Sequence, residues 1–412
     1  MATPLILANA RLLGSDALID ERPVGDVTDV VVEGRITEIR QGVASANAQR
    51  IDLDGRWLLP GLWDNHVHMG QWTLWSRHAS VADATSAAAV AAHVLADGPD
   101  ETGIAIYAGA RTGLWPDSPD KHMLTAAYPI VVVSSDAHSM WLNQVALERF
   151  GYSSHPTGIL VEDDNFAVLT KLHDVPETQL DSWVRQSAAA AAARGVVGIV
   201  DLEWGWNIGD WRRREANGFD LLQVEAGFYA EHLDLALAEG WSTGQPAGRQ
   251  LHCGPLKVIF DGSLGTRTAF CSQAYPDGSH GQLNLSEADL ELLVQRAAAG
   301  GIATTVHAIG DEANRIALDI FERTGLTGTI EHAQQVCDDD ICRFAALGVV
   351  ASVQPEHAMD DRELVARYWA NADGVYRLRS LHEAGATLQF GSDAPVTPLD
   401  PWFAIASAVT RT

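Results

Sequence analysis

The sequence predicts an α/β fold: a (β/α)8 TIM barrel, a small β-sandwich module built from the N-terminal segment, and an insertion after barrel strand 1. Three observations support this fold class. Short apolar runs alternate with amphipathic helical runs over most of the chain, which is typical of parallel βα units. Several predicted strands end in His, Lys or Asp, as expected where barrel strands build a site. The first 56 residues form short strand-like runs between turn signals.

The length and composition suit a large globular protein with few basic groups. The chain has 412 residues, of which 47% are hydrophobic, enough for a sizeable core. The formal net charge of −26 argues against nucleic acid or an anionic membrane as a partner. Four cysteines without a Cys-x-x-Cys pair do not form a disulfide framework. The N-terminus has no basic region before its apolar run, and no apolar run reaches about 18 residues. We therefore expect a soluble cytoplasmic protein.

Residues 1–56 are expected to form the N-terminal part of the small β-sandwich domain, and residues 57–412 the barrel. Four runs in the first segment alternate or cluster β-branched residues between turns. They are 5–7, 29–33, 35–39 and 50–53.

Ten later segments read as strands, two more than the barrel needs. The eight assigned to the barrel are 62–67, 196–203, 221–229, 256–261, 302–308, 328–332, 349–354 and 386–393. The other two, 104–110 and 130–136, lie in a region rich in Gly, Pro, Asp and Trp that lacks regular alternation, so we assign residues 70–175 to an insertion. Helices are expected at 176–194, after Ser286 up to Gly300, and from Asp311 to Gly325, where caps mark their ends.

The first barrel strand ends in His66-Val67-His68. Side chains two residues apart on a strand point to the same face, so the two imidazoles project together. Such a pair is half of a metal site if further ligands arrive from other strands.

Later strands supply those candidates. Lys257 lies in the fourth strand, and the fifth, sixth and eighth strands end in His307, His332 and Asp393. The carboxyl ends of barrel strands meet at one face of the barrel. Four imidazoles, a carboxylate and a lysine would suit zinc or a similar divalent ion.

Each of these residues also has a purely structural interpretation. A single histidine near a strand end is often a hydrogen-bonded core residue, Asp393 could cap a helix before Pro395, and Lys257 could extend along an apolar surface. These interpretations would all have to hold at five strand ends in the same relative position. The metal site therefore explains the pattern better.

The pattern resembles the amidohydrolase superfamily, in particular its YtcJ-like branch of metal-dependent hydrolases (amidohydrolase 3 type). The resemblance spans residues 1 to about 400. It is carried by PGLWDNHVH, LKVIFDGSLGTRTAF, TTVHAIGDEA, TIEHAQ, SVQPEH and FGSDAPV.

The resemblance implies a divalent metal, with zinc expected as one or two ions. The implied ligands are His66, His68, Lys257, His307, His332 and Asp393. Lys257 takes the position where relatives often carry a carboxylated lysine that bridges two metals, and without carboxylation the same residues could hold one metal. The implied catalytic residues are Asp393, Lys257 and His307, with Asp393 moving the proton of a metal-activated water.

The implied activity is hydrolysis of carbon–nitrogen bonds in non-peptide amides such as N-formyl, N-acyl or cyclic amides. Three alternatives remain open: a deaminase, an esterase or lactonase using the same site, or a non-catalytic regulatory relative. The expected partner is a small amide-type substrate, and a homodimer is one option for the assembly.

Substrate-binding groups are expected around this site. His138, Trp141 and Asn143 belong by the resemblance to an inserted region that faces the pocket, and Trp72, Trp75, Trp115, Trp204 and Trp206 are further aromatic candidates for its wall. Polar candidates follow strands four and seven, although capping would explain each as well: Asp261, Arg267, Gln354 and His357.

The C-terminal segment departs from the resemblance. Relatives continue past the eighth strand with a final helix and a return to the β module, whereas this sequence stops at Thr412, inside the expected last barrel helix. We expect either a C-terminally truncated fragment or a β module that closes differently.

Overall fold

The structure is a computed structural model that describes residues 4–13, 27–43, 47–99, 103–172, 175–369 and 374–411. It divides into two compact units, Met1–Leu62 and Trp63–Thr412. In the described residues no helix has the length and apolarity that crossing a bilayer requires.

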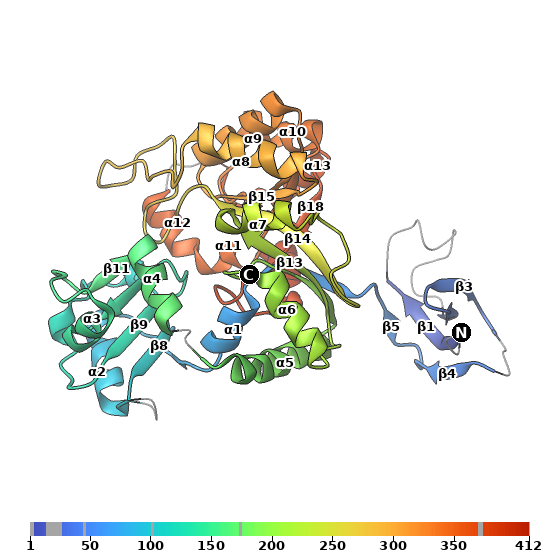
Figure 1. Cartoon of the computed structure of the whole chain (residues 1–412), viewed down its shortest axis with the longest axis horizontal. Coiled ribbons are helices and arrows are strands. Elements are labelled where there is room, and N and C mark those ends of the chain that lie inside the picture. Colours follow the sequence, from blue (N-terminus) through green and yellow to red (C-terminus); the bar gives the residue numbers. More distant parts are fainter. Residues whose placement is uncertain are drawn as a thin grey trace. The chain divides into compact units, whose positions relative to one another are not determined.

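The first unit is a five-stranded sheet, drawn in blue in Figure 1. Its strands are β1 (Leu5–Leu12), β2 (Val27–Val32), β3 (Ile36–Arg40), β4 (Gln49–Asp52) and β5 (Trp57–Leu58). β1 pairs antiparallel with β2 and parallel with β4 and β5. Ile6, Ala8 and Ala10 alternate as the buried face of β1. The predicted N-terminal β module is confirmed.

The second unit contains an eight-stranded parallel sheet whose strand order follows the chain, which confirms the predicted barrel. Helices surround it (Figure 1). The strands are β6 (Leu62–Val67), β12 (Val196–Asp201), β13 (Gln223–Tyr229), β14 (Leu251–Ile259), β15 (Thr304–Ala308), β16 (Thr329–His332), β17 (Val350–Val353) and β18 (Leu388–Phe390). The helices are α1 (Met69–Trp75), α5 (Glu177–Ala193), α6 (Asn207–Ala216), α7 (Leu233–Ala238), α8 (Glu287–Ala299), α9 (Asp311–Thr324), α10 (Asp338–Leu347), α11 (His357–Asp360), α12 (Arg362–Tyr368), α13 (Leu378–Glu383) and α14 (Pro401–Thr410).

The barrel closes between its first and last strands. Val67 forms a parallel bridge with Ala394 just beyond β18, and the Ser392 N–H donates to Oδ1 of Asp64 over 2.9 Å. The Asn65 side-chain amide also donates to the carbonyl of Phe390 over 3.0 Å. The seam therefore runs through the residues next to His66 and Asp393.

β14 begins at Leu251, five residues before the predicted start. The predicted strand starts directly after Pro255, a residue that cannot donate to a ladder. In the structure the β13–β14 register shifts there: Ala226 pairs with Cys253, but Phe228 pairs with Leu256. One extra residue on β14 forms a bulge that accommodates the proline.

The insertion after β6 forms a separate five-stranded sheet in the order β11-β10-β9-β8-β7. In Figure 1 it is the teal sheet, with α2, α3 and α4 beside it. Its elements are β7 (Ala79–Ser80), α2 (Ala87–Asp97), β8 (Ala105–Ala110), β9 (Ile130–Ser134), β10 (Ser139–Leu142), α3 (Gln144–Phe150), β11 (Ile159–Val161) and α4 (Glu162–Leu172). The two surplus predicted strands correspond to β8 and β9, so their assignment to the insertion is confirmed.

Candidate metal centre

The seam of the barrel brings the His66 and His68 pair to Asp393. The Asp393 N–H donates to the carbonyl of His66 over 2.7 Å, and the His68 N–H donates to the carbonyl of Ala394 over 2.9 Å. Asp393 adopts a left-handed backbone with φ of 55°. Its Oδ1 lies 3.2 Å from His66 Nε2 and 3.4 Å from His68 Nε2. Three potential ligand atoms from the two ends of the barrel chain thus lie together.

A buried carboxylate holds the His66 ring from behind. His66 Nδ1 lies 2.7 Å from Oε2 of Glu331, and the two side chains are 1% and 3% exposed. The Thr305 hydroxyl donates to the other oxygen of Glu331 over 2.5 Å. Burial would raise the pKa of Glu331, but the His66 ring lowers it to about 2. Because the ionised carboxylate accepts a hydrogen bond from the Nδ1–H of His66, the Nε2 lone pair is free for a metal.

Three further donors come from the middle strands. Lys257 Nζ lies 3.3 Å from His66 Nε2, and burial lowers the pKa of this lysine. The rings of His307 and His332 meet edge to face with centroids 4.4 Å apart. A buried lysine with a lowered pKa spends more time as the neutral amine, which is the form that can react with CO2 to give a carbamate.

The donor set fits a divalent metal. A tetrahedral zinc ion with bonds of about 2.0–2.1 Å needs ligand atoms about 3.3–3.4 Å apart, close to the separations around Asp393 Oδ1. Within the described part of the chain, four buried histidine nitrogens have no hydrogen-bond partner. Three of them, His68 Nδ1, His332 Nδ1 and His357 Nε2, belong to residues of this cluster, and the fourth is His232 Nδ1. Two clusters, His66–His68–Asp393 and His332–His357–Asp393, each have ligand atoms within 4.8 Å of one another. A cation at Asp393 would balance its carboxylate and bond the unpaired nitrogens of His332 and His357, which face Oδ2.

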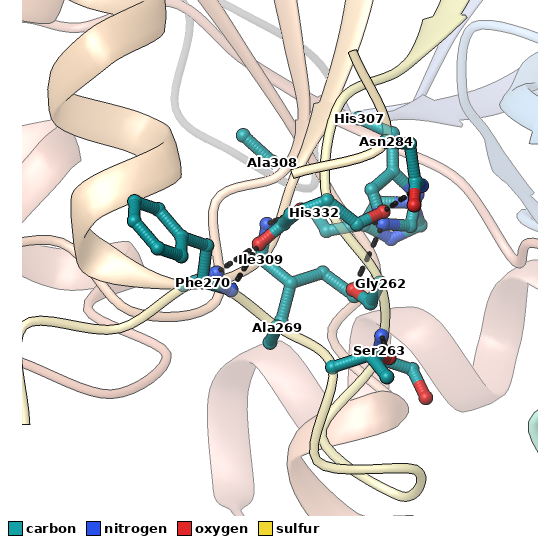
Figure 2. Close-up of polar contacts among 12 residues, drawn as sticks. Gly262, Ser263, Ala269, Phe270, Asn284, His307, Ala308, Ile309 and His332 are labelled. Atoms are coloured by element: carbon teal, nitrogen blue, oxygen red, sulfur yellow. Dashed lines mark hydrogen bonds and ion pairs between the residues drawn. The ribbon is translucent and has the colours of Figure 1, made fainter. Parts of the chain in front are cut away.

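Asp261 lies behind this cluster rather than in the pocket. It is fully buried, and its carboxylate accepts N–H bonds from Phe270, Ile309 and Gly310 over 2.9–3.0 Å. Burial raises the pKa of Asp261 to about 7 against the effect of these donors. His307 Nε2 lies 3.2 Å from the Gly262 carbonyl oxygen. Figure 2 marks this contact with a dashed line. Asp261 therefore fastens the loops after β14 and β15. Because the Gly262 carbonyl faces His307 Nε2, Nδ1 is the nitrogen of this ring that is available to a metal.

The pocket over these residues has an aromatic wall and an acidic wall. Trp204, after β12, and Tyr229, in β13, stack with ring centroids 4.3 Å apart and an angle of 10° between the ring planes. The ring centroid of Phe166, from the insertion, lies 5.6 Å from that of Trp204. The acidic wall consists of Asp136, Asp360 and Asp361. Burial raises the pKa of Asp360 to about 6 and that of Asp361 to about 7.

His138 of the insertion lies on the same pocket wall, as does His357 of α11. Burial alone would lower the pKa of His138, but the Glu162 carboxylate raises it to about 9. Burial would likewise raise the pKa of Glu162, but the His138 imidazole lowers that pKa to about 2. The pocket wall thus pairs an imidazole whose pKa is raised with a carboxylate whose pKa is lowered.

Other residues expected at the pocket lie elsewhere, because the insertion and the loops use them for packing. Trp141 is buried against Trp115 inside the insertion, with ring centroids 6.4 Å apart. Asn143 caps α3 through a bond from the Ala146 N–H. Arg267 is about half exposed and pairs with Asp277.

The remaining expected residues have mixed positions. Gln354 is buried beneath the cluster, with Nε2 3.3 Å from His66 Nδ1. Trp72 packs on the barrel core and Trp75 on the insertion core. Trp206 stacks on His232 at 5.8 Å.

Glu331 and Glu162 are functional candidates that the residue pattern did not predict. Glu331 immediately precedes His332, and an acidic residue inside a parallel barrel strand is unusual because such strands are mostly apolar. An acid in this otherwise apolar strand was the sequence feature that could have marked Glu331 as a functional residue. Glu162 follows β11 directly and begins a run of three acids, and no local signal distinguishes it from Asp163 and Asp164.

Comparisons with known proteins agree with this architecture. The model of the amidohydrolase family matches residues 49–412. Sequence relatives include the protein LONG AFTER FAR-RED 3 of Arabidopsis thaliana (25% identical over 99% of this chain and 78% of that protein). YtcJ of Bacillus subtilis, assigned as an amidohydrolase, is 24% identical over 93% of this chain and 79% of its own length. The N-substituted formamide deformylase of Arthrobacter pascens is 24% identical over 93% of this chain and 78% of its own length. Among solved structures, an uncharacterized metal-dependent hydrolase from Pyrococcus horikoshii superposes with a TM-score of 0.82 and 25% identity, covering 99% of this chain and 86% of that one.

Proposed function

The chain belongs to the amidohydrolase family, with YtcJ among its relatives. From that membership we propose that it hydrolyses carbon–nitrogen bonds of non-peptide amides, with N-formyl and N-acyl amines as its substrates. The observation that carries the proposal is the cluster at the barrel seam, where Asp393 Oδ1 lies within 3.4 Å of both His66 and His68 Nε2. A carboxylate between two imidazoles can serve as a ligand and as a proton carrier.

Six residues would hold the metal, and we propose zinc, as one or two ions. Its proposed ligands are His66, His68, Lys257, His307, His332 and Asp393, with Lys257 as a carboxylated bridge. When bound, such an ion lowers the pKa of a coordinated water towards about 7 and polarises a carbonyl group.

Asp393 is the proposed proton carrier. Oδ1 faces His66 and His68, whereas among the described residues the ring nitrogens nearest to Oδ2, those of His332 and His357, lie 3.9 Å away. We therefore assign Oδ2 to accept the proton of the attacking water and to return it to the leaving nitrogen. Glu331 keeps His66 in the tautomer that leaves its Nε2 unprotonated.

The substrate class is proposed from the pocket wall and from one relative. The relative named N-substituted formamide deformylase acts, by its name, on formamides with a nitrogen substituent. The wall of Phe166, Trp204 and Tyr229 offers flat apolar surface for such a substituent. We propose an N-formyl or small N-acyl amine whose amine part is aromatic or apolar, with His138 and His357 as polar contacts.

The test combines metal analysis with a substrate panel. Metal per chain is measured by mass spectrometry on protein purified without added metal, before and after dialysis against a chelator. N-benzylformamide, N-acetylbenzylamine, an aryl ester and an aminopyrimidine are then assayed for amine, acid or ammonia release. Amine release from the formamide that is lost with the metal and restored by zinc supports the proposal. Ammonia release alone, ester cleavage alone, or activity that is unaffected by metal removal would contradict it.

A further inference from the structure

A buried ion pair lies on the pocket wall outside the strand-end cluster. His138, between β9 and β10 of the insertion, has Nδ1 2.9 Å from Oε2 of Glu162, the first residue of α4. The side chains are 15% and 11% exposed. The His138 ring lines the pocket together with Lys257, and its centroid lies 6.1 Å from that of His307. The imidazole thus stands between a carboxylate and the metal-binding cluster.

The backbone is strained on both sides of the pair. Ala137, immediately before His138, has φ of 58°, and Glu162 has φ of 48°. Residues other than glycine rarely adopt this left-handed region, and such strain persists only where the surroundings impose it. The Glu162 N–H donates to the His138 carbonyl over 3.0 Å, so backbone and side-chain contacts both hold the two residues together.

The loop after β14 fixes the carboxylate from the other side. Oε1 of Glu162 accepts from the hydroxyls of Thr268 over 2.7 Å and Thr266 over 2.9 Å. Position 262 of this loop is a glycine, and a Cβ there would clash with Thr268 Oγ1 and crowd Oε1 of Glu162. Both oxygens of the carboxylate therefore have a set direction, and with them the plane of the His138 ring.

Docking of the insertion does not depend on this pair alone. The Ser263 hydroxyl donates to Oδ2 of Asp136 over 3.1 Å, which joins the same loop to the insertion independently. The Glu162 carboxylate, 2.9 Å from Nδ1, favours a proton on both ring nitrogens of His138. Among the described residues no hydrogen bond involves His138 Nε2, so this nitrogen is left for a ligand in the pocket.

We propose that Glu162 is a positioning residue that acts through His138, holding the ring so that its Nε2–H donates to the acyl oxygen of the substrate. The inference rests on the proposed function, because it needs a carbonyl substrate at the metal centre. It adds a polarising donor that comes from the insertion, in contrast to every residue proposed as a ligand, which comes from the barrel. The pair would strengthen its bond to the oxygen as negative charge develops there.

The experiment compares Glu162→Gln, His138→Asn and the double variant with wild-type holoenzyme. Asp163→Asn is the matched control, since this neighbouring acid is exposed and loses the same charge. Removing one oxyanion donor costs roughly 10²–10³ in kcat, so weakening it in Glu162→Gln should cost about 10–100-fold while KM changes less than about threefold. The Kd of benzohydroxamate, a metal-binding acyl probe, should rise about tenfold. Metal content and melting temperature should stay at wild-type values.

Non-additivity separates positioning from a merely structural role. If Glu162 acts through His138, the double variant loses no more kcat than His138→Asn alone. Additive losses, or a Glu162→Gln variant that matches Asp163→Asn in kcat and hydroxamate Kd, would overturn the proposal. If Glu162→Gln does not fold, His138→Asn carries the test, and wild-type kcat and Kd in that variant would overturn it.

Failure of this inference is distinguishable from failure of the proposed function. If wild type hydrolyses an amide and Glu162→Gln has the same kcat, the proposed function stands and the proposed role of the Glu162–His138 pair is refuted. If wild type cleaves the ester but no amide, and Glu162→Gln reduces that cleavage, the proposed amide activity is refuted but the role of Glu162 is supported. If no substrate in the panel turns over, the hydroxamate Kd values decide the role of the pair.

Discussion

The bond between Glu331 and His66 predicts a measurable loss of metal affinity when Glu331 is replaced by Gln. The two atoms are 2.7 Å apart, and both side chains are almost completely buried. A hydrogen bond to a charged group contributes about 1.5–3 kcal/mol in such a setting. Since every 1.4 kcal/mol is tenfold, the metal Kd should rise about 10–100-fold, which matches the usual effect of a carboxylate behind a metal-bound histidine.

The assay is competition for zinc between the protein and chromophoric chelators of graded affinity, with metal content measured in parallel. Glu322→Gln is the control, because Glu322 is 61% exposed and lies on the outer helix α9. Glu331→Gln should retain a wild-type melting temperature in the apo form to within a few degrees. A zinc Kd within twofold of wild type would refute the assignment of Glu331 as the residue that orients His66.

Four shorter predictions concern other parts of the molecule. Lys257→Ala should lower bound metal from two ions to one if the lysine bridges, whereas two ions in the variant would exclude bridging. Trp204→Ala should raise KM for an N-aryl formamide about tenfold and leave N-methylformamide unchanged in a steady-state assay. Gly198→Ala should destabilise by about 1–3 kcal/mol in denaturant unfolding, since the new Cβ would overlap the Trp63 ring. Burial alone would raise the pKa of Asp29, but hydrogen bonds from the Asn9 and Val43 N–H groups lower it. A lowered folded-state pKa contributes stability that is present above the unfolded value of 3.8 and is lost as the pH falls through the folded-state pKa. Asp29→Asn should therefore lower the free energy of unfolding at pH 7, and its difference from wild type in denaturant unfolding should shrink as the pH falls below the unfolded value.

The order of strands and the residues at their ends could be predicted because periodicity and chemistry coincide there. The strand ends at His66, His307, His332 and Asp393 carry polar groups after apolar runs, and parallel strands bring such ends together. The predicted start of β14 was wrong because the bulge at Pro255 depends on the pairing of β14 with β13.

The contacts that orient the site could not be predicted because they join distant segments. Glu331 reaches His66 across 265 positions, and neither residue marks the other in the sequence. Trp141 was expected at the pocket, yet whether an indole faces a pocket or a neighbouring indole depends on the packing of the insertion. Glu162 is one of three consecutive acids, and only the fold distinguishes it from the other two.

The barrel seam makes the candidate metal centre a reporter of barrel closure. Asp393 follows His66 by more than three hundred positions, yet the two residues share a backbone hydrogen bond. Contacts of such long range form only after much of the chain is ordered. On a ribosome, a nascent chain could not acquire the full site until position 393 had left the exit tunnel, so high-affinity metal uptake would follow synthesis of the eighth barrel strand. Metal delivery to this protein would then be a post-folding event, and zinc binding by stalled chains of increasing length would time barrel closure.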